Sequence, residues 1–182
     1  ADGEAELTVR LMRGTEELDR LALPLRVVAP TSVHSRTFIS EVDGSVQYYG
    51  VQPAKPAPGR TRPCALVLTL HGAGVEARGQ AAAYSPKTWA NIVAPTNRRP
   101  YGFDWEDWGR LDAIEVLAEA KRRYDYDPER VYLTGHSMGG HGAWHVGLTF
   151  PDLFGAVRPS AGWVSFASYG GGPAGELASP LA

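Results

Sequence analysis

The chain has 182 residues, a net charge of −2, 43% hydrophobic residues and a single cysteine. This length suits one domain, and the balanced charge provides no basic surface for nucleic acid. The longest apolar run, residues 65–70, is far shorter than the roughly 20 residues that span a bilayer, so we expect neither nucleic acid nor a membrane as partner.

Residues 1–36 are predicted to form an N-terminal extension. Its two apolar patches, 7–12 and 21–28, are separated by a charged stretch and specify no particular arrangement. The chain opens at Ala1 without a Met and without a basic and then apolar leader, so either a signal peptide has been removed or the sequence starts within a longer protein. Two locations therefore stay open, cytoplasmic and exported with the signal peptide removed. Cys64 cannot form an intrachain disulfide, and we interpret it as a packing residue.

An antiparallel hairpin is predicted from two strands, residues 38–42 and 46–51. Between them, Asp43-Gly44 is typical of a two-residue turn, because both central positions must accept positive φ. The following segment, 53–63, is rich in Pro and Gly and is interpreted as a connection between strands.

From residue 65 onward, short apolar runs alternate with helical stretches, which indicates a mostly parallel, doubly wound α/β sheet. Strands are expected at residues 65–70, 91–94, 130–134 and 156–159. Helices are expected at residues 107–124 and 139–150. The first helix carries apolar residues at helical spacing, namely Leu111, Ile114, Leu117 and Ala118.

A first catalytic motif lies between the third of these strands and the second helix. Gly135-His136-Ser137-Met138-Gly139 matches the nucleophile elbow, in which a sharp turn lifts a serine hydroxyl clear of the sheet. Strand, turn and helix occur in the required order. The motif therefore predicts that Ser137 is a nucleophile on a strained turn.

A second motif, Leu70-His71-Gly72-Ala73-Gly74, directly follows the first buried strand. This is the expected place of an oxyanion loop, whose backbone N–H groups stabilise the charge that develops during acyl transfer. We assign the two donors to the amides of Ala73 and Met138 and expect them to point into one common space.

With these motifs the sequence resembles the α/β-hydrolase superfamily, nearest its prolyl-oligopeptidase-like and esterase D or polyhydroxyalkanoate-depolymerase-like branches. The resemblance is carried by residues 124–140, 70–74, the helix around Asp112 and residues 150–154. It implies an eight-stranded sheet with the nucleophile after the fifth strand, an acid after the seventh and a histidine after the eighth. We accordingly expect a partial hydrolase domain at residues 37–163, truncated after about the sixth strand, and a loop or disordered tail at 164–182.

The histidines of the chain are interpreted as structural. His71 and His136 belong to the two motif turns, where packing and hydrogen bonding are favoured over a role as base. His141 and His145 lie on the helix that leads away from Ser137, and His34 lies far upstream. The base and its acid are therefore expected beyond the chain end.

Aromatic residues near the predicted rim leave two interpretations open. Tyr101 and Trp105 either clasp a substrate or cap the following helix and cover the core. The neighbouring acidic residues are interpreted as stabilising the positive end of that helix, so no metal site is predicted.

The leading hypothesis is a serine hydrolase that cleaves carboxylic esters through an acyl-enzyme on Ser137, without a cofactor. Its substrate is a small-molecule ester or peptide, because a peptidase of the prolyl-oligopeptidase kind would carry the same motifs. A noncatalytic hydrolase-like binding module is the third alternative. The chain as given is expected to be an incomplete and inactive fragment with strand 156–159 at a bare sheet edge, and its oligomeric state is not predicted.

Overall fold

The computed structural model describes residues 2–99 and 102–165. The first of these parts contains β1 (Gly3–Arg13), β2 (Glu16–Val27), β3 (His34–Ile39), β4 (Val46–Gln52), β5 (Cys64–Leu70), α1 (Ala77–Ala82) and β6 (Ala90–Ala94). The second contains α2 (Asp107–Arg123), β7 (Tyr126–His136), α3 (Met138–Thr149), the short 3₁₀ helix η1 (Pro151–Leu153) and β8 (Ala156–Ser160). The strands and helices predicted after residue 64 are confirmed.

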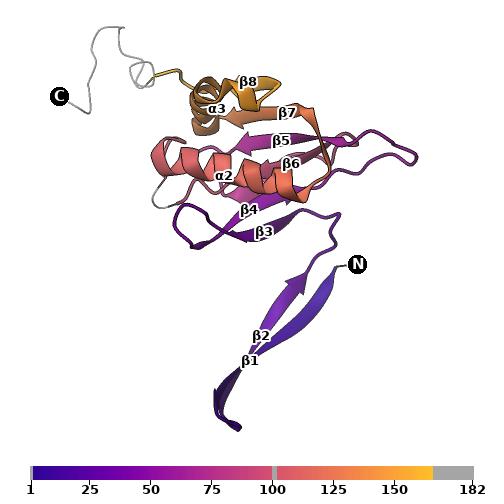
Figure 1. Cartoon of the computed structure of the whole chain (residues 1–182), viewed down its shortest axis with the longest axis vertical. Coiled ribbons are helices and arrows are strands. Elements are labelled where there is room, and N and C mark those ends of the chain that lie inside the picture. Colours follow the sequence, from indigo (N-terminus) through magenta and orange to yellow (C-terminus); the bar gives the residue numbers. More distant parts are fainter. Residues whose placement is uncertain (1, 100–101, 166–182) are drawn as a thin grey trace, which may run out of the picture.

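Six of the strands form one sheet in the order β3-β4-β6-β5-β7-β8 (Figure 1). β3, β4 and β6 are joined antiparallel, whereas β6, β5, β7 and β8 run parallel. All residues of the central strand β5 are buried, as in a parallel strand that is covered on both faces. The predicted class, an antiparallel hairpin leading into a mostly parallel α/β sheet, is confirmed.

Alternate residues of β5 face opposite layers of the domain. Leu66, Leu68 and Leu70 belong to the main core, which α2 and α3 close on one face of the sheet. Thr69 faces the other way, where its hydroxyl accepts a hydrogen bond from Nε2 of Gln80 on α1 at 2.8 Å. Helices therefore cover both faces, as a doubly wound sheet requires.

The face that carries α1 is partly open over β5, β7 and β8. A groove of about 560 Å³ lies there, lined in part by Val67, Ile92 and Tyr132. In the described part of the chain β8 is an edge strand, and its Val157 is 38% exposed. The predicted edge position of this strand is confirmed.

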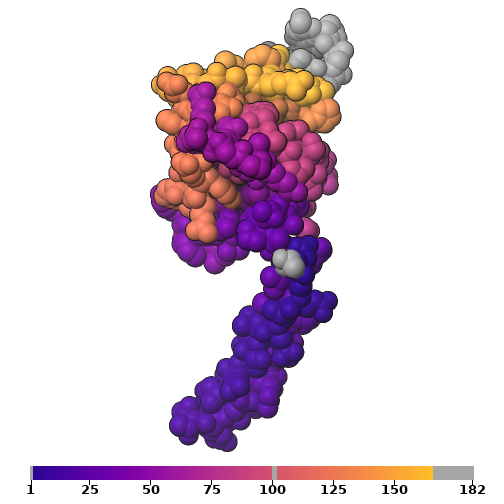
Figure 2. Space-filling model, turned by 90° about the vertical axis from the view of Figure 1, so that its right-hand side faces the viewer, coloured from indigo at the N-terminus to yellow at the C-terminus, as the bar shows by residue number. Residues whose placement is uncertain are grey.

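β1 and β2 form a separate antiparallel hairpin, called the arm below, that projects from the domain (Figures 1 and 2). Every residue of both strands is exposed. The register places leucines and valines of both strands on one face, among them Leu7, Val9 and Leu23. The two apolar patches of the extension are thus partner strands, and β3 begins at His34, before the expected domain start at residue 37.

The hairpin of β3 and β4 does not have the predicted two-residue turn. β3 ends at Ile39 and pairing begins with Val46, so residues 40–45 form a longer loop. Of the two predicted turn residues, Gly44 has a positive φ, +73°, and Asp43 does not. In this loop the side chains of Ser40 and Asp43 contact buried charged groups, described below.

Candidate active site

Ser137 lies at the turn where β7 ends and α3 begins. Its backbone angles, φ +56° and ψ −121°, are outside the conformations that a serine normally adopts. Such strain persists only where the surrounding structure imposes it. The predicted strained strand-to-helix turn at Ser137 is confirmed.

Glycines let three backbone segments meet at this turn. A Cβ on Gly135 would overlap the carbonyl O of Gly139, and a Cβ on Gly139 would overlap the carbonyl O of Leu70. Because the obstructing atoms belong to the backbone, neither position can accept a side chain without a shift of the main chain. The elbow therefore packs directly against the end of β5.

The backbone N–H and C=O of Ser137 form hydrogen bonds, but its hydroxyl forms none among the described residues. Its amide donates to the carbonyl O of Ser160 at 2.9 Å, and its own carbonyl O accepts from the amides of Gly140 and His141. In the described part of the chain the hydroxyl forms no hydrogen bond, and the residue is partly exposed. The hydroxyl is thus available to a ligand at the positive end of α3.

A tight turn directly follows β5. The amide of Val75 donates to the carbonyl O of Gly72 at 3.3 Å, and Gly74 has the φ of +77° that a type II turn requires of its third residue. A Cβ placed on Gly72 would lie 3.6 Å from Cβ of Ser137. The two predicted motifs are therefore in contact.

The two amides assigned as oxyanion donors lie on these neighbouring segments. Met138 is the first residue of α3, so its N–H has no acceptor within the helix. The N–H of Ala73 likewise forms no hydrogen bond among the described residues. Both amides are available to donate a hydrogen bond to a ligand oxygen.

His71 and His136 flank the turn without forming a hydrogen bond to Ser137. The buried ring of His71 has Nδ1 3.0 Å from the carbonyl O of Gly72 and Nε2 3.1 Å from that of Thr96. Burial lowers the pKa of His71 and so favours its neutral form. His136 is exposed, with Nδ1 3.4 Å from the hydroxyl of Ser160.

His141 and His145 occupy α3. His141 contacts Oε1 of Glu106 through Nε2 at 3.1 Å, and its Nδ1 lies 3.0 Å from the carbonyl O of Trp163. Burial lowers the pKa of His145. His34, at the start of β3, contacts the carbonyl O of Ser32. In the described part of the chain, no histidine ring is hydrogen-bonded to the hydroxyl of Ser137.

The two aromatic residues considered for the substrate rim differ in their placement. Tyr101 lies outside the described residues. Trp105 is 0% exposed, and its Nε1 donates to the carbonyl O of His71 at 3.0 Å. Trp105 therefore lies in the core beneath the turn after β5, which corrects the rim placement, because the loop that carries it folds inward.

Within residues 2–99 and 102–165, no three His, Cys, Asp or Glu side chains are grouped so that they could hold a metal ion. No helix in this part is long and apolar enough to cross a membrane.

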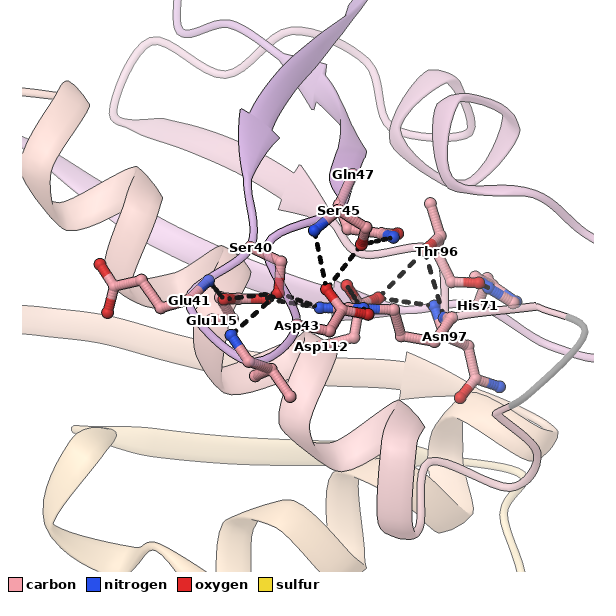
Figure 3. Close-up of polar contacts among 12 residues, drawn as sticks. Ser40, Glu41, Asp43, Ser45, Gln47, His71, Thr96, Asn97, Asp112 and Glu115 are labelled. Atoms are coloured by element: carbon pink, nitrogen blue, oxygen red, sulfur yellow. Dashed lines mark hydrogen bonds and ion pairs between the residues drawn. The ribbon is translucent and has the colours of Figure 1, made fainter.

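A buried charged network beside the site was missed by the sequence analysis (Figure 3). Arg98 is 4% exposed and donates from Nη1 to Asp43 at 2.9 Å and from Nη2 to Glu115 at 2.8 Å. Glu115 also accepts from the hydroxyl of Ser40. The network therefore joins the loop between β3 and β4 to helix α2.

Asp112, also on α2, holds the loop that follows β6. Its Oδ2 accepts from the amide of Asn97 at 2.8 Å and from the hydroxyl of Thr96 at 3.1 Å. Burial raises the pKa of Asp112 to about 6. Because the carbonyl O of Thr96 contacts His71, this network extends to the turn after β5 (Figure 3).

Asp112 and Glu115 were not predicted because the buried face of the helix was inferred from the positions of its apolar residues. Leu111, expected inside, is 43% exposed, whereas Asp112 and Glu115 are buried. One signal was available: two acidic residues three positions apart share a helical face and follow an arginine in the preceding loop.

Comparison with known proteins identifies the family. Residues 64–173, more than half of the chain, match the family described as "Putative esterase". The chain belongs to this esterase family. The resemblance to the α/β-hydrolase superfamily is thereby confirmed, and the matched region includes both motif turns.

Two curated relatives and one solved structure illustrate the similarity. The poly(3-hydroxyalkanoate) depolymerase C of Paucimonas lemoignei is 27% identical over an alignment of 158 residues, which covers 74% of this chain and 36% of the relative. An uncharacterized secreted protein of Arthroderma benhamiae is 29% identical over an alignment of 118 residues, which covers 57% of this chain and 13% of the relative.

The S-formylglutathione hydrolase of Staphylococcus aureus has the same fold. It superposes with a TM-score of 0.58 at 18% identity, over 72% of this chain and 57% of its own. The chain thus spans little more than half of this esterase-family structure and about a third of the depolymerase.

Proposed function

We propose that the protein hydrolyses carboxylic esters through an acyl-enzyme on Ser137. The observation that carries this proposal is the strained turn that holds Ser137 between β7 and α3 with its hydroxyl unengaged in the described part of the chain. Oγ attacks the acyl carbon, a new C–O bond forms, and the alcohol leaves with a proton. Water then hydrolyses the acyl-enzyme and restores the hydroxyl.

The negative charge on the attacked carbonyl oxygen would be bound by the amides of Ala73 and Met138. The two amides lie on segments that contact each other, and neither amide has an acceptor among the described residues. Both observations support this assignment. Removal of one such donor typically costs about 100- to 1,000-fold in kcat.

A base is required because a serine hydroxyl stays protonated at neutral pH. None of the described histidine rings is hydrogen-bonded to the hydroxyl of Ser137, so we assign the catalytic His and its Asp partner to sequence that follows residue 182 in the complete polypeptide. The greater length of the curated relatives supports this assignment.

The substrate is proposed to be an ester of a small or polymeric carboxylic acid, with no cofactor. The family match and the polyester-cleaving activity named for the Paucimonas lemoignei relative support an ester over a peptide. Of the two locations, cytoplasmic and exported, the second is supported by the name of the second relative, a secreted protein.

The test compares the 182-residue chain with the complete polypeptide. The complete polypeptide is expected to hydrolyse p-nitrophenyl butyrate and to be labelled on Ser137 by a fluorophosphonate, as mapped by mass spectrometry. The 182-residue chain is expected to be labelled only weakly, because its serine lacks an imidazole base.

Two serine variants provide the control. In the complete polypeptide Ser137→Ala should lower kcat at least about 1,000-fold, whereas Ser85→Ala, at an exposed site in the segment after α1, should leave it unchanged. Full activity of Ser137→Ala, or a preference for peptides over esters, would refute the proposal. Rapid stoichiometric labelling of the 182-residue chain would show that a base lies within it.

A further inference from the structure

The indole of Trp105 is wedged between the turn after β5 and the helix that follows Ser137. On one side its Nε1 donates to the carbonyl O of His71 at 3.0 Å, and its ring meets the His71 ring edge-on at 4.8 Å between centroids. On the other side it fills the space above Gly142 of α3, where a Cβ would collide with the indole. One buried side chain thus touches both elements that carry the assigned oxyanion donors.

The backbone around Trp105 is strained to place the indole there. Trp105 has a φ of +62° and the preceding Asp104 a φ of +55°. For a bulky residue the left-handed region is a genuine outlier, and it persists only where the surrounding structure imposes it. Asp104 is also 2% exposed, and neither of its carboxylate oxygens has a hydrogen-bond partner among the described residues.

A short series of contacts leads from Trp105 to the amide of Ala73. Trp105 fixes His71 through both its carbonyl and its ring, and Nδ1 of that ring lies 3.0 Å from the carbonyl O of Gly72. The amide of Val75 holds the same oxygen. In a trans peptide the C=O of Gly72 and the N–H of Ala73 point in opposite directions, so fixing the oxygen also fixes the direction of that N–H.

We propose that Trp105 is a positioning residue for ester hydrolysis: it holds the turn 71–75 against α3 and thereby directs the N–H of Ala73 toward the oxygen that Ser137 would charge. The inference rests on the proposed function. Because the oxyanion exists only in the transition state and the intermediate, a misdirected donor lowers kcat and leaves KM nearly unchanged.

Trp105→Phe tests this, because it keeps an aromatic ring but removes the indole N–H. In the 182-residue chain, hydrogen exchange at the amide of Val75, which closes the turn, is expected to become at least about tenfold faster than at amides of β5 and α3. In the complete polypeptide, kcat for p-nitrophenyl butyrate is expected to fall about tenfold or more, with KM within about twofold.

Trp89→Phe is the matched control. Trp89 packs on Tyr132 in the groove on the other face of the sheet, so this variant should change neither Val75 exchange nor kcat. Gly142→Ala displaces the indole from the α3 side and is expected to reproduce the effects of Trp105→Phe. It also keeps the proposal testable if Trp105→Phe does not fold.

The inference is overturned if Trp105→Phe and Gly142→Ala leave Val75 exchange unchanged. It is also overturned if hydrogen exchange in these variants rises equally at all amides while kcat per folded molecule is maintained. In that case Trp105 would stabilise the domain without positioning the N–H of Ala73. Failure of the proposed function is a separate result: Ser137→Ala would then remain active, while the exchange data would still report on Trp105.

Discussion

Around Ser137, main-chain atoms approach so closely that only glycine fits at several positions. Gly139 faces the carbonyl of Leu70, and Gly140 faces that of Ser160 at the end of β8. The first contact fixes the turn at Ser137 against β5, which leads into the turn 71–75. The second contact fixes it against β8. These contacts hold the left-handed conformation of Ser137 in place.

Replacement of Gly139 by alanine is expected to destabilise the domain by about 2–3 kcal/mol, because the new methyl group meets backbone atoms of β5 that cannot move independently. Chemical denaturation measures the loss. Gly79→Ala on α1 is the control, since the nearest atom would be 3.6 Å from its Cβ and alanine favours a helix by about 0.5–1 kcal/mol. Equal stabilities of the two variants would contradict the steric account.

Asp112→Asn is expected to change the pH dependence of stability. The folded protein binds a proton at Asp112 below about pH 6, but the unfolded chain does so only below the ordinary value of 3.8. Stability therefore falls as pH rises from about 4 to 6, by up to about 3 kcal/mol. Asparagine does not titrate, so the variant does not lose stability in this way. The difference obtained by subtracting the unfolding free energy of the wild type from that of the variant should therefore rise from about pH 4 to 6.

Asp43→Asn provides the control of opposite sign. Hydrogen bonds from the hydroxyl and amide of Ser45, with Arg98 nearby, lower the pKa of Asp43 to about 2. Its contribution to stability is present above about pH 4 and is lost as pH falls toward 2, so the difference from the wild type should be constant above about pH 5. Urea titrations at pH 4.5 and 7.5 distinguish the variants, and a constant difference for Asp112→Asn would refute its raised pKa.

Among the elements, those whose sequence pattern matches their environment were predicted. β5 is mostly apolar because both its faces are covered, and the tight turn at Ser137 follows from the glycines around it. The buried face of α2 was predicted only in part: Leu117 is buried, but Asp112 and Glu115 were not expected there, because acidic residues by themselves indicate a solvent-exposed face. Arg98 pairs with Glu115 and so allows its burial. For Trp105 the sequence left a substrate rim and the core as alternatives, and it could not decide between them because the inward position depends on positive φ in residues that rarely adopt it.

The arm was not predicted because its strands have no covering layer to fix their pattern. A two-stranded hairpin is at best marginally stable by itself in water. Trypsin is therefore expected to cut at exposed arginines of the arm, such as Arg10 and Arg20, before it cuts within the six-stranded sheet.

Peptide mapping over time measures the order of cleavage. The remaining domain should keep its thermal midpoint within about 2 °C, because the arm buries none of its residues against the sheet. An arm that resists trypsin as long as the sheet does would show that its apolar face is covered in solution.

Over the whole molecule, one main core extends from Phe38 near the end of β3 to Val146 on α3. The sheet places β5 between β6 and β7, so both of its neighbours come later in the chain. The core can therefore close only when the second half of the domain is present.

This strand order has a consequence for synthesis on the ribosome. The 66 residues that follow Leu70, up to His136, take roughly 3–13 s to add at about 5–20 residues per second. During that interval β5, which is apolar apart from Thr69, has been synthesised but one of its edges has no partner strand. The nascent chain is then most prone to misassociation, and this is the stage at which a chaperone that binds extended apolar segments would protect it.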